Sequence, residues 1–250
     1  MWPRQSRATK PAPVADADAE APAVEITALG DAALRVAIAL NFEAAPVAAL
    51  RAVLEARDRV RAANIPGVTG VTSAYETLGI YYDPYCAGPV ELLIRNVRHA
   101  ISGRRAATAP VARAVVVPVC YDREFAIDIA EVAKRATLSI EEVAALHSSA
   151  EYHVVCVGFT PGFPYLSGLP RELATPRRAT PRTQVPAGAV AIGGTQTGIY
   201  PQASPGGWNI IGRTPLRLFD PTKDPPALLQ AGDVVRFRTI SRKEFSTLAK

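Results

Sequence analysis

The chain reads GFTPGFPYLSGLP at residues 158–170 and ATPRRATPRTQVPAGAVAIGGTQTGIYPQASPGGWNIIGRTP at residues 174–215, and this stretch constrains the fold most strongly. Glycine reaches backbone conformations closed to other residues and proline locks φ, so their dense alternation describes a chain bent repeatedly into one shape. A disordered linker can also be rich in Gly and Pro, but it lacks interleaved aromatic residues. The aromatics here are Phe159, Phe163, Tyr165, Tyr200 and Trp208. The stretch is therefore predicted to form the functional surface.

The composition is that of a globular protein with one or two domains. Of the 250 residues, 48% are hydrophobic, which is enough to bury a sizeable core. No apolar run approaches the roughly 20 residues needed to cross a bilayer, and the start of the chain lacks the apolar segment of a signal peptide. A cytoplasmic protein with no membrane partner is therefore expected. The net charge of +5 is too modest and dispersed to argue for nucleic acid.

Several familiar chemistries lack the residues they need. The odd number and wide spacing of Cys86, Cys120 and Cys156 suit neither a disulfide framework nor a CxxC metal site. The histidines fit no metal pattern, so no metal site is expected. Gly193 and Gly198 have the spacing of a phosphate loop, but Ile199-Tyr200 stands where the loop needs Lys-Ser/Thr. No GxSxG serine elbow is present, and no Met-Lys-Met sequence is available for biotin attachment.

The pattern in the first part of the chain predicts an N-terminal tail followed by a small α+β unit. Residues 1–23 are rich in Ala and Pro and carry too little apolar surface to order, so a disordered tail is expected. Alternating and helical apolar periodicities then follow in the order ββαββα. The expected elements are strands at 24–30 and 34–40, a helix at 46–64, strands at 68–73 and 77–82, and a helix at 90–103. A domain at 24–103 is predicted.

The second part predicts a β-barrel. The polar, Pro-containing segment 104–112 is interpreted as a linker, and a domain is expected at 113–241. A strand at 114–119 is followed by helices at 128–135 and 140–147, the second opening with a capping box at Ser139 and Glu142. The runs YHVVCVGF, AVAIGG, WNIIG, LRLF and VVRFRTI then predict short strands. Many short strands with Gly/Pro punctuation favour a closed or partly closed barrel, because closure removes exposed edges.

The arginines of TPRRATPR are the best chemical lead. The planar guanidinium can hold a carboxylate or phosphate at two points, and Arg177, Arg178 and Arg182 lie among rigid prolines. The alternative is that each pairs with a surface acid or lies in solvent. Any single aromatic of the stretch can equally be core, but as a group beside Gln196 and Thr197 they resemble a pocket wall.

At these motifs the chain resembles the family of the 5-oxoprolinase B subunit, also described as KipI-like histidine-kinase inhibitors, as allophanate hydrolase subunit 1 and as carboxyltransferase subdomains C and D. The resemblance runs from about Gly30 to Arg238 through EYHVVCVGFTPGFPYL, ATPRRATPR, GGTQTGIYP, SPGGW and LLQAGDVVRF. It implies an α+β fold in which a small ferredoxin-like domain precedes a cyclophilin-like β-barrel. One departure is DREFAIDI at residues 122–129, where the family has a turn containing glycine and Pro-Asp.

The resemblance implies the site and its partners. Substrate-binding residues are expected among Phe159, Pro161, Gly162, Phe163, Arg178, Arg182, Gln196, Thr197, Tyr200 and Trp208. They are expected to line either the ligand site of the barrel or the contact with the C subunit. The implied activity is ATP-dependent opening of 5-oxoproline to glutamate together with the A and C subunits, with ATP and magnesium in the complex. The catalytic base is not identified.

Two alternative functions remain open from the sequence. The first is a component of an allophanate or urea carboxyltransferase, in which the same pocket binds carboxybiotin or allophanate and another chain carries the biotin. The second is a KipI-like regulator that binds a histidine kinase and is not an enzyme. A neighbouring gene for the C subunit would favour the 5-oxoprolinase interpretation.

Overall fold

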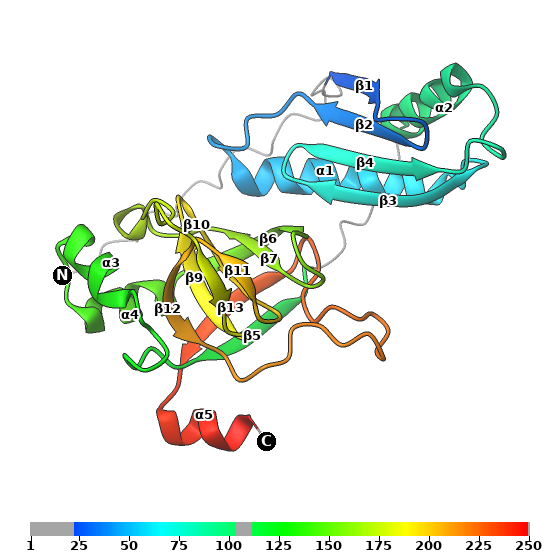
Figure 1. Ribbon diagram of the computed structural model, residues 1–250. Helices are drawn as coiled ribbons and strands as arrows, with labels where there is room; N and C mark the ends of the chain where they lie inside the picture. Colours follow the sequence, from blue (N-terminus) through cyan, green and yellow to red (C-terminus); the bar gives the residue numbers. More distant parts are fainter. Residues whose placement is uncertain (1–22, 104–111, 250) are drawn as a thin grey trace, which may run out of the picture.

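The structure, a computed structural model, describes residues 23–103 and 112–249 (Figure 1). The predicted tail, apart from Ala23, and the predicted linker, apart from Ala112, lie outside the described residues. A four-stranded sheet and a seven-stranded sheet each carry a large hydrophobic core, and a two-stranded sheet accompanies the larger one.

The first unit is an antiparallel sheet with two helices packed against one face. Its strands are β1 (Val24–Ala28), β2 (Ala33–Ile38), β3 (Val68–Ala74) and β4 (Thr77–Tyr82), in the order β1-β2-β4-β3, and its helices are α1 (Pro46–Ala62) and α2 (Val90–Ser102). Apolar residues alternate along β2 and β4, so that Leu34, Val36, Leu78 and Ile80 are buried beneath the helices. The predicted order ββαββα is confirmed.

The second unit is a seven-stranded sheet that curls into a partly closed barrel. In spatial order its strands are β12 (Asn209–Arg213), β9 (Ala189–Gly193), β10 (Gln196–Ile199), β7 (Pro164–Ser167), β6 (Glu151–Val157), β13 (Val234–Thr239) and β5 (Ala114–Val119). Cys120, just after β5, exchanges two backbone hydrogen bonds of 2.9 Å with Arg213 of β12. This bridge joins the two edges of the sheet, so the predicted α+β fold with a curled barrel is confirmed.

Four helical segments flank the barrel. They are α3 (Ile129–Ala136), α4 (Ile140–Ser149), the 3₁₀ helix η1 (Arg171–Leu173) and α5 (Arg242–Leu248). The predicted capping box is present: Ser139 Oγ accepts from Glu142 N at 3.1 Å, and Glu142 Oε2 accepts from Ser139 N at 2.7 Å. Among residues 23–103 and 112–249 no helix has the length and apolarity needed to cross a membrane.

The predicted strand at LRLF, residues 216–219, is wrong. Only Phe219 forms a bridge, with Ala227, while Leu218 is buried at the end of the barrel core without a ladder. A short apolar run can be buried as irregular chain, because periodicity reports burial and does not supply a neighbouring strand. The strands β7, β10, β8 (Arg182–Val185) and β11 (Ser204–Gly206) were not predicted, since their Gly, Pro and Gln residues are typical of turns.

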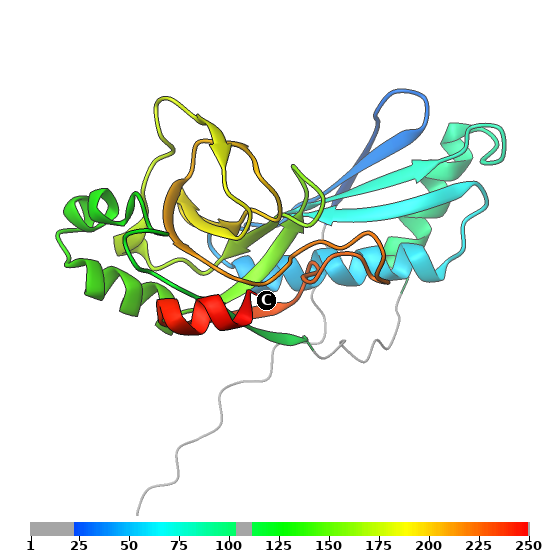
Figure 2. The same cartoon turned by 60° about the horizontal axis from the view of Figure 1, so that its bottom comes forward.

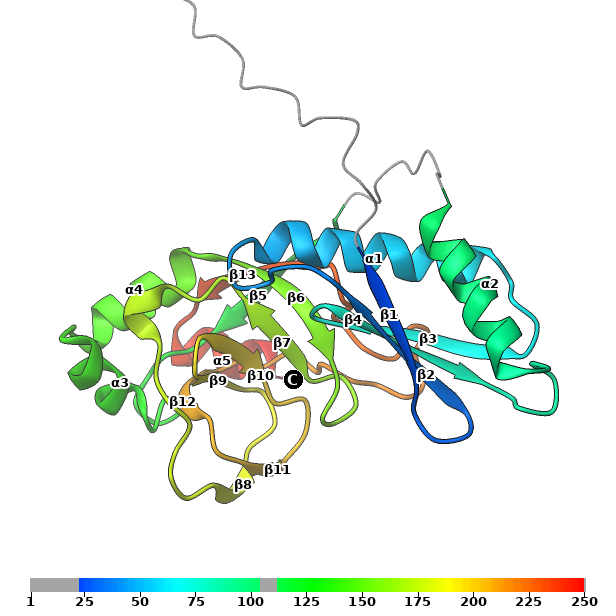
Figure 3. The same ribbon diagram turned by 90° about the horizontal axis from the view of Figure 1, so that it is seen from above.

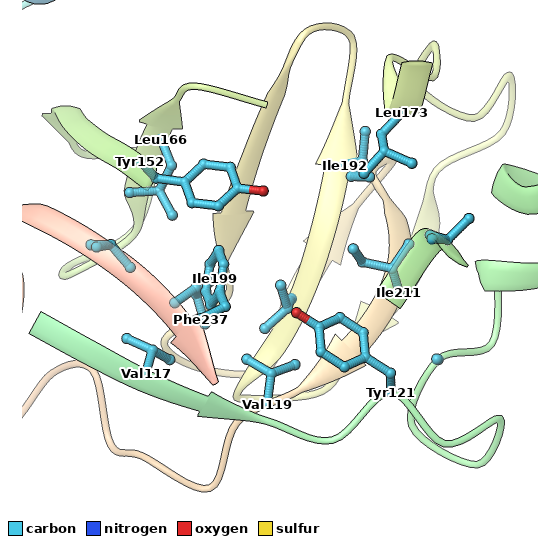
Figure 4. Close-up of a cluster of buried hydrophobic side chains, with 14 of the residues drawn as sticks. Val117, Val119, Tyr121, Tyr152, Leu166, Leu173, Ile192, Ile199, Ile211 and Phe237 are labelled. Atoms are coloured by element: carbon cyan, nitrogen blue, oxygen red, sulfur yellow. The ribbon is translucent and has the colours of Figure 1, made fainter. Parts of the chain in front are cut away.

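The barrel core contains polar groups inside an apolar cluster (Figure 4). The hydroxyl groups of Tyr121 and Tyr152 point into the cluster formed by Leu166, Ile192 and their neighbours. Tyr121 Oη lies 2.8 Å from His147 Nδ1, and Tyr152 Oη donates to the His147 carbonyl oxygen at 2.8 Å. Buried hydroxyl groups need such partners, because an unpaired one costs about 1–3 kcal/mol.

Gly212 lies where β12 meets the end of β5, and the space there admits no side chain. A Cβ at this position would lie 2.7 Å from Val119 Cγ1 and 3.0 Å from the carbonyl oxygen of Cys120, both in fully buried residues. We expect Gly212→Ala to lower the free energy of unfolding by about 1–2 kcal/mol, because overpacking strains the closure of the barrel. Urea denaturation followed by tryptophan fluorescence measures this.

Gly70 in β3 provides the matched control for Gly212. A Cβ there would meet Tyr81 Cδ2 at 3.7 Å, which is ordinary van der Waals contact. Gly70→Ala is therefore expected to change the free energy of unfolding by no more than about 0.5 kcal/mol. Equal losses in the two variants would contradict the assignment of Gly212 to barrel closure.

The two units touch along α1 and along the hairpin of β3 and β4 (Figures 2 and 3). Gly232, with φ +100°, lies so close to α1 that a Cβ would be 2.7 Å from Leu54 Cδ1. The tip of the hairpin reaches the barrel, where the hydroxyl of Tyr75 donates to Gln196 Oε1 at 3.1 Å. The first unit thus contributes a side chain to the stretch that the sequence marks as functional.

Candidate functional site

Backbone contacts hold the arginine-bearing segment, residues 174–182, across the barrel. Thr175 exchanges backbone hydrogen bonds with Gly194, and Arg178 N donates to the Gly207 carbonyl oxygen at 2.7 Å. Asn209 Nδ2 donates to the Pro176 carbonyl oxygen at 2.9 Å. The motifs GGTQTG, SPGGW and TPRRATPR, which are separate in the sequence, therefore meet on one surface.

Asp128 binds two of the predicted arginines. Arg182 donates from Nη1 to Asp128 Oδ2 at 2.9 Å and from Nη2 to Oδ1 at 2.7 Å, and Arg178 Nη1 donates to Oδ1 at 3.1 Å. Ile210 N donates to Oδ2 at 2.7 Å, so the carboxylate accepts four hydrogen bonds while only 6% exposed. Two guanidinium groups on one carboxylate leave a surplus of one positive charge. This cluster orders the arginines and keeps the surface cationic.

Behind the arginines lies an aromatic cluster. Phe163, Tyr200 and Trp208 are buried and Tyr165 is half-buried, with ring centroids 4.9–5.8 Å apart in tilted and edge-to-face pairs. Gly193 sits beneath Trp208, because a Cβ there would lie 2.5 Å from the indole ring. The aromatic residues of the predicted site are thus brought together, and most of their surface is core.

Arg177 differs from its two neighbours. Its guanidinium carbon lies 5.7 Å from the centroid of the Trp208 ring, and the residue is exposed. Within the described part of the chain no carboxylate forms an ion pair with Arg177, whereas Arg178 and Arg182 both bind Asp128. Arg177 is therefore the arginine of this segment best placed to meet an anionic ligand.

Gln196 and Thr197 are neighbours in β10 but face different surroundings. Gln196 is half-buried and accepts the Tyr75 hydroxyl on Oε1. Thr197 is fully buried; its hydroxyl donates to the Ala191 carbonyl oxygen at 3.0 Å and lies 3.0 Å from His147 Nε2. The structure therefore places Thr197 in the core network, with no atom left to meet a ligand, and leaves Gln196 at the surface.

The turn between β6 and β7 presents an exposed aromatic ring. Phe159 is 68% exposed and has φ +69°, a left-handed conformation that is rare for a bulky residue. The turn is closed by Phe163 N donating to the Thr160 carbonyl oxygen at 3.0 Å, and buried Gly162 packs against Phe219. Pro161 is exposed beside Phe159. Phe159 and Pro161 thus form a rim, while Gly162 and Phe163 are interior.

Burial keeps the phenols of the site protonated. Burial raises the pKa of Tyr165, with the positive charge of Arg177 opposing it. Burial also raises the pKa of Tyr200, opposed by the backbone N–H of Trp208 and by Arg177. The site therefore offers neutral hydrogen-bonding groups and a cation. In the described ranges no cluster of three or more His, Cys, Asp or Glu residues could hold a metal ion.

Four residues of this surface lie outside the predicted site. Tyr75 belongs to the other unit, and Asp128 stands within DREFAIDI, where the chain departs from the family pattern. Arg177 belongs to the arginine group and Tyr165 to the aromatics, but the motifs assign neither to the site. The available signals are the residue types of Arg177 and Tyr165. Tyr75 and Asp128 leave no local pattern, because their partners Gln196 and Arg178 lie 121 and 50 residues away.

The chain thus joins an α+β unit to a curled barrel that carries an arginine segment beside an aromatic cluster. Residues 24–229 match the family described as carboxyltransferase domain, subdomain C and D, and the chain belongs to this family. The 5-oxoprolinase B subunit of Bacillus subtilis is 43% identical over 189 residues, covering 72% of this chain and 79% of that protein. The 5-oxoprolinase B subunit of Escherichia coli is 56% identical over 131 residues, covering 52% of this chain and 60% of that protein.

Solved structures share the architecture. TTHA0988 is 37% identical with a TM-score of 0.71, and the match covers 84% of this chain but only 40% of that longer chain. Kluyveromyces lactis urea carboxylase has a TM-score of 0.72 at 20% identity, covering 90% of this chain and 22% of the enzyme, so it supports the fold alone.

Proposed function

We propose that this chain works as the B subunit of an ATP-dependent 5-oxoprolinase, a cytoplasmic hetero-oligomer in which the A and C subunits join it to open 5-oxoproline to glutamate. The names of the relatives support the assignment. The observation in the structure that carries it is the cationic surface over the aromatic cluster, with Arg178 and Arg182 ordered by Asp128 and Arg177 above Trp208. A positive surface of this kind suits a small substrate with a carboxylate.

The reaction opens a stable lactam. Resonance holds the ring amide, so uncatalysed attack by water on its carbonyl carbon is slow. In the complex, ATP with magnesium supplies the driving force: overall, 5-oxoproline, ATP and two water molecules become glutamate, ADP and inorganic phosphate. The ring C–N bond breaks, the carbonyl carbon gains the oxygen of a carboxylate, and the ring nitrogen leaves as the amino group.

The residues of this chain bind and orient the substrate. The surplus positive charge around Asp128 and Arg177 attracts its carboxylate and the negative charge that develops on the reacting oxygen. Gln196 orients the ring, and the buried rings of Phe163, Tyr200 and Trp208 exclude water from one side. The exposed pair Phe159 and Pro161 lies at the rim, where it contacts the C subunit in the proposed complex.

Coexpression with candidate A and C subunits tests the proposal. The complex is expected to hydrolyse ATP only when 5-oxoproline is added. Arg182→Ala is expected to lower this turnover about tenfold or more, because it removes the surplus positive charge that Arg178 and Arg182 together hold around Asp128. Liberated phosphate measures the rate.

The control is Arg135→Ala on the exposed side of α3, which is expected to keep full turnover. Each variant complex is purified and its assembly checked by size-exclusion chromatography before assay. A wild-type complex without 5-oxoproline-dependent turnover would contradict the proposed function. Full turnover with Arg182→Ala would contradict only the role of the arginine cluster and would leave the proposed function in place.

A further inference from the structure

Tyr75 stands in a backbone conformation that its own side chain does not favour. It occupies the first position of the two-residue turn between Ala74 of β3 and Thr77 of β4, with φ +53°. Glycine is usual at such a position, and a left-handed residue with a Cβ costs about 1–2 kcal/mol. Strain of this kind persists where the surrounding structure over-determines the residue, and it points to a role for the side chain.

The first unit holds this turn firmly. Glu76 Oε1 accepts from Phe42 N at 2.7 Å, and the Glu76 carbonyl oxygen accepts from Ile38 N at 2.9 Å. Thr77 Oγ1 donates to the Ala74 carbonyl oxygen at 2.9 Å. The ring of Tyr75 packs edge-on against Phe42 with centroids 5.4 Å apart. Tyr75 N also donates to the Val155 carbonyl oxygen of β6 at 3.5 Å, so both units set the position of the Tyr75 hydroxyl, with most of the contacts coming from the first unit.

That hydroxyl is the hydrogen-bond partner of the Gln196 carboxamide oxygen. It donates to Gln196 Oε1 at 3.1 Å, and burial raises the pKa of Tyr75, so the proton needed for this bond is present at neutral pH. The other end of the amide, Nε2, has no hydrogen-bond acceptor within the described part of the chain. With its oxygen held by Tyr75, Gln196 offers the two N–H donors of Nε2, which match the carbonyl oxygen of a ligand.

The neighbouring groups extend this donor into a site. Gln196 pairs with Gly193, whose backbone lies under Trp208, and Arg177 lies over the Trp208 ring. The ring of Tyr165 lies near both Trp208 and Tyr75, with its centroid 5.8 Å from that of Trp208 and 6.5 Å from that of Tyr75. An amide donor and a guanidinium that no described carboxylate pairs thus share one aromatic-walled surface, to which both units contribute.

We propose that Tyr75 is a positioning residue that turns Gln196 Nε2 toward the ring carbonyl of a lactam acid, while Arg177 binds the carboxylate of the same ligand. The inference rests on the proposed function for the identity of the ligand, and it assigns the carboxylate to Arg177 because Arg178 and Arg182 already bind Asp128. Tyr75, Gln196 and Arg177 then recognise the two polar ends of one small ring.

Three probes separate the two ends of the ligand. 5-Oxoproline has both the ring carbonyl and the carboxylate, 2-pyrrolidinone has only the carbonyl, and proline has only the carboxylate. NMR spectra of the full ¹⁵N-labelled chain report on Gln196 through its side-chain NH₂ resonances, which are assigned by their loss in Gln196→Glu. We expect these resonances to shift with 5-oxoproline and 2-pyrrolidinone and to stay in place with proline.

Two variants test the assignments separately. Tyr75→Phe keeps the ring packing and removes only the hydroxyl. We expect it to weaken the binding of both lactams about fivefold, as the loss of one neutral hydrogen bond does. Arg177→Met is expected to weaken the binding of 5-oxoproline about tenfold and to leave the binding of 2-pyrrolidinone unchanged. The control Tyr85→Phe, at an exposed tyrosine of the first unit, is expected to bind all probes like the wild type.

The outcomes distinguish this inference from the proposed function. It is overturned if saturating lactam leaves the Gln196 NH₂ resonances in place, or if Tyr75→Phe binds the lactams as tightly as the wild type does. If the Gln196 resonances shift but the complex shows no 5-oxoproline-dependent ATP turnover, the binding site is supported and the 5-oxoprolinase assignment is contradicted. If the complex turns over ATP but the Gln196 resonances do not respond, the binding site is contradicted and the 5-oxoprolinase assignment is supported.

Discussion

Replacing Asp128 with alanine is expected to lower the free energy of unfolding by about 3 kcal/mol, at the lower end of the range for breaking a buried ion pair. The carboxylate is 6% exposed and accepts hydrogen bonds from Arg178, from Arg182 twice and from the backbone of Ile210. Its loss leaves two adjacent guanidinium groups without a counter-charge and a buried N–H without an acceptor. The side chains of Arg178 and Arg182 are 38% and 23% exposed, and the water they meet keeps the cost near the lower limit.

Equilibrium urea denaturation measures the loss, and two variants make the comparison specific. Asp128→Asn keeps the shape and removes the charge, so it is expected to lie between the wild type and Asp128→Ala. Glu151→Ala breaks another arginine–carboxylate pair, in which Arg236 donates from Nε at 3.1 Å and from Nη2 at 2.6 Å. That pair is exposed, so its loss is expected to cost less than about 1 kcal/mol. Similar costs for Asp128→Ala and Glu151→Ala would show that burial does not govern the Asp128 cluster.

The second large effect is a loss of stability in acid through His147. Complete burial lowers the pKa of His147 from 6.5 to about 3. The hydrogen bonds agree with a neutral ring: Thr197 donates to Ala191, so His147 Nε2–H donates to Thr197, and Nδ1 accepts from Tyr121. A charged ring would carry a proton on Nδ1, so Tyr121 Oη would have to accept instead of donate, and the buried O–H of Tyr121 would lose its acceptor.

The sign of the pH dependence follows from the lowered pKa. In the unfolded chain the histidine takes up a proton below pH 6.5, whereas in the folded chain it stays neutral down to about pH 3. The stability that neutral His147 contributes to the folded chain is fully present above pH 6.5. It is lost as the pH falls toward 3, at about 1.4 kcal/mol per pH unit. Between pH 7 and pH 5 the wild type is therefore expected to lose about 2 kcal/mol through this group.

His147→Gln isolates this contribution. Glutamine offers a donor and an acceptor but does not titrate, so the variant is expected to be less stable at pH 7 and to lose about 2 kcal/mol less than the wild type between pH 7 and pH 5. Urea denaturation of both proteins at the two pH values gives the difference. Parallel losses in the two proteins would mean that His147 can be protonated in the folded state.

The sequence predicted the regular elements well where the pattern is long. The apolar stripe of α1, the alternation in β2 and the capping box at Ser139 all appear as expected. These features depend on contacts within a few residues, which local periodicity reports directly. The short strands β7, β8, β10 and β11 escaped prediction because three or four residues rich in Gly, Pro and Gln become strands only through their partners.

The candidate site shows the same division. The motifs place the arginines, aromatics and Gln196 on one stretch, but they do not show that Asp128 binds Arg178 and Arg182 and leaves Arg177 unpaired by any described carboxylate. Nor do they show that Thr197 turns inward to His147 while its neighbour Gln196 stays at the surface. Alternation along a strand predicts opposite faces, but which face meets the core depends on how the sheet curls.

The sequence by itself determined the order of the elements in the first unit, the α+β class of the fold and the family, because these depend on patterns and motifs written along the chain. The tertiary structure decided which charges are paired, which hydroxyls are buried and that Tyr75 of the first unit reaches Gln196 of the barrel. The physical reason is that hydrogen bonds and ion pairs act within about 3–4 Å. Only closure of the barrel and the contact between the units bring residues that are distant in the sequence within that range.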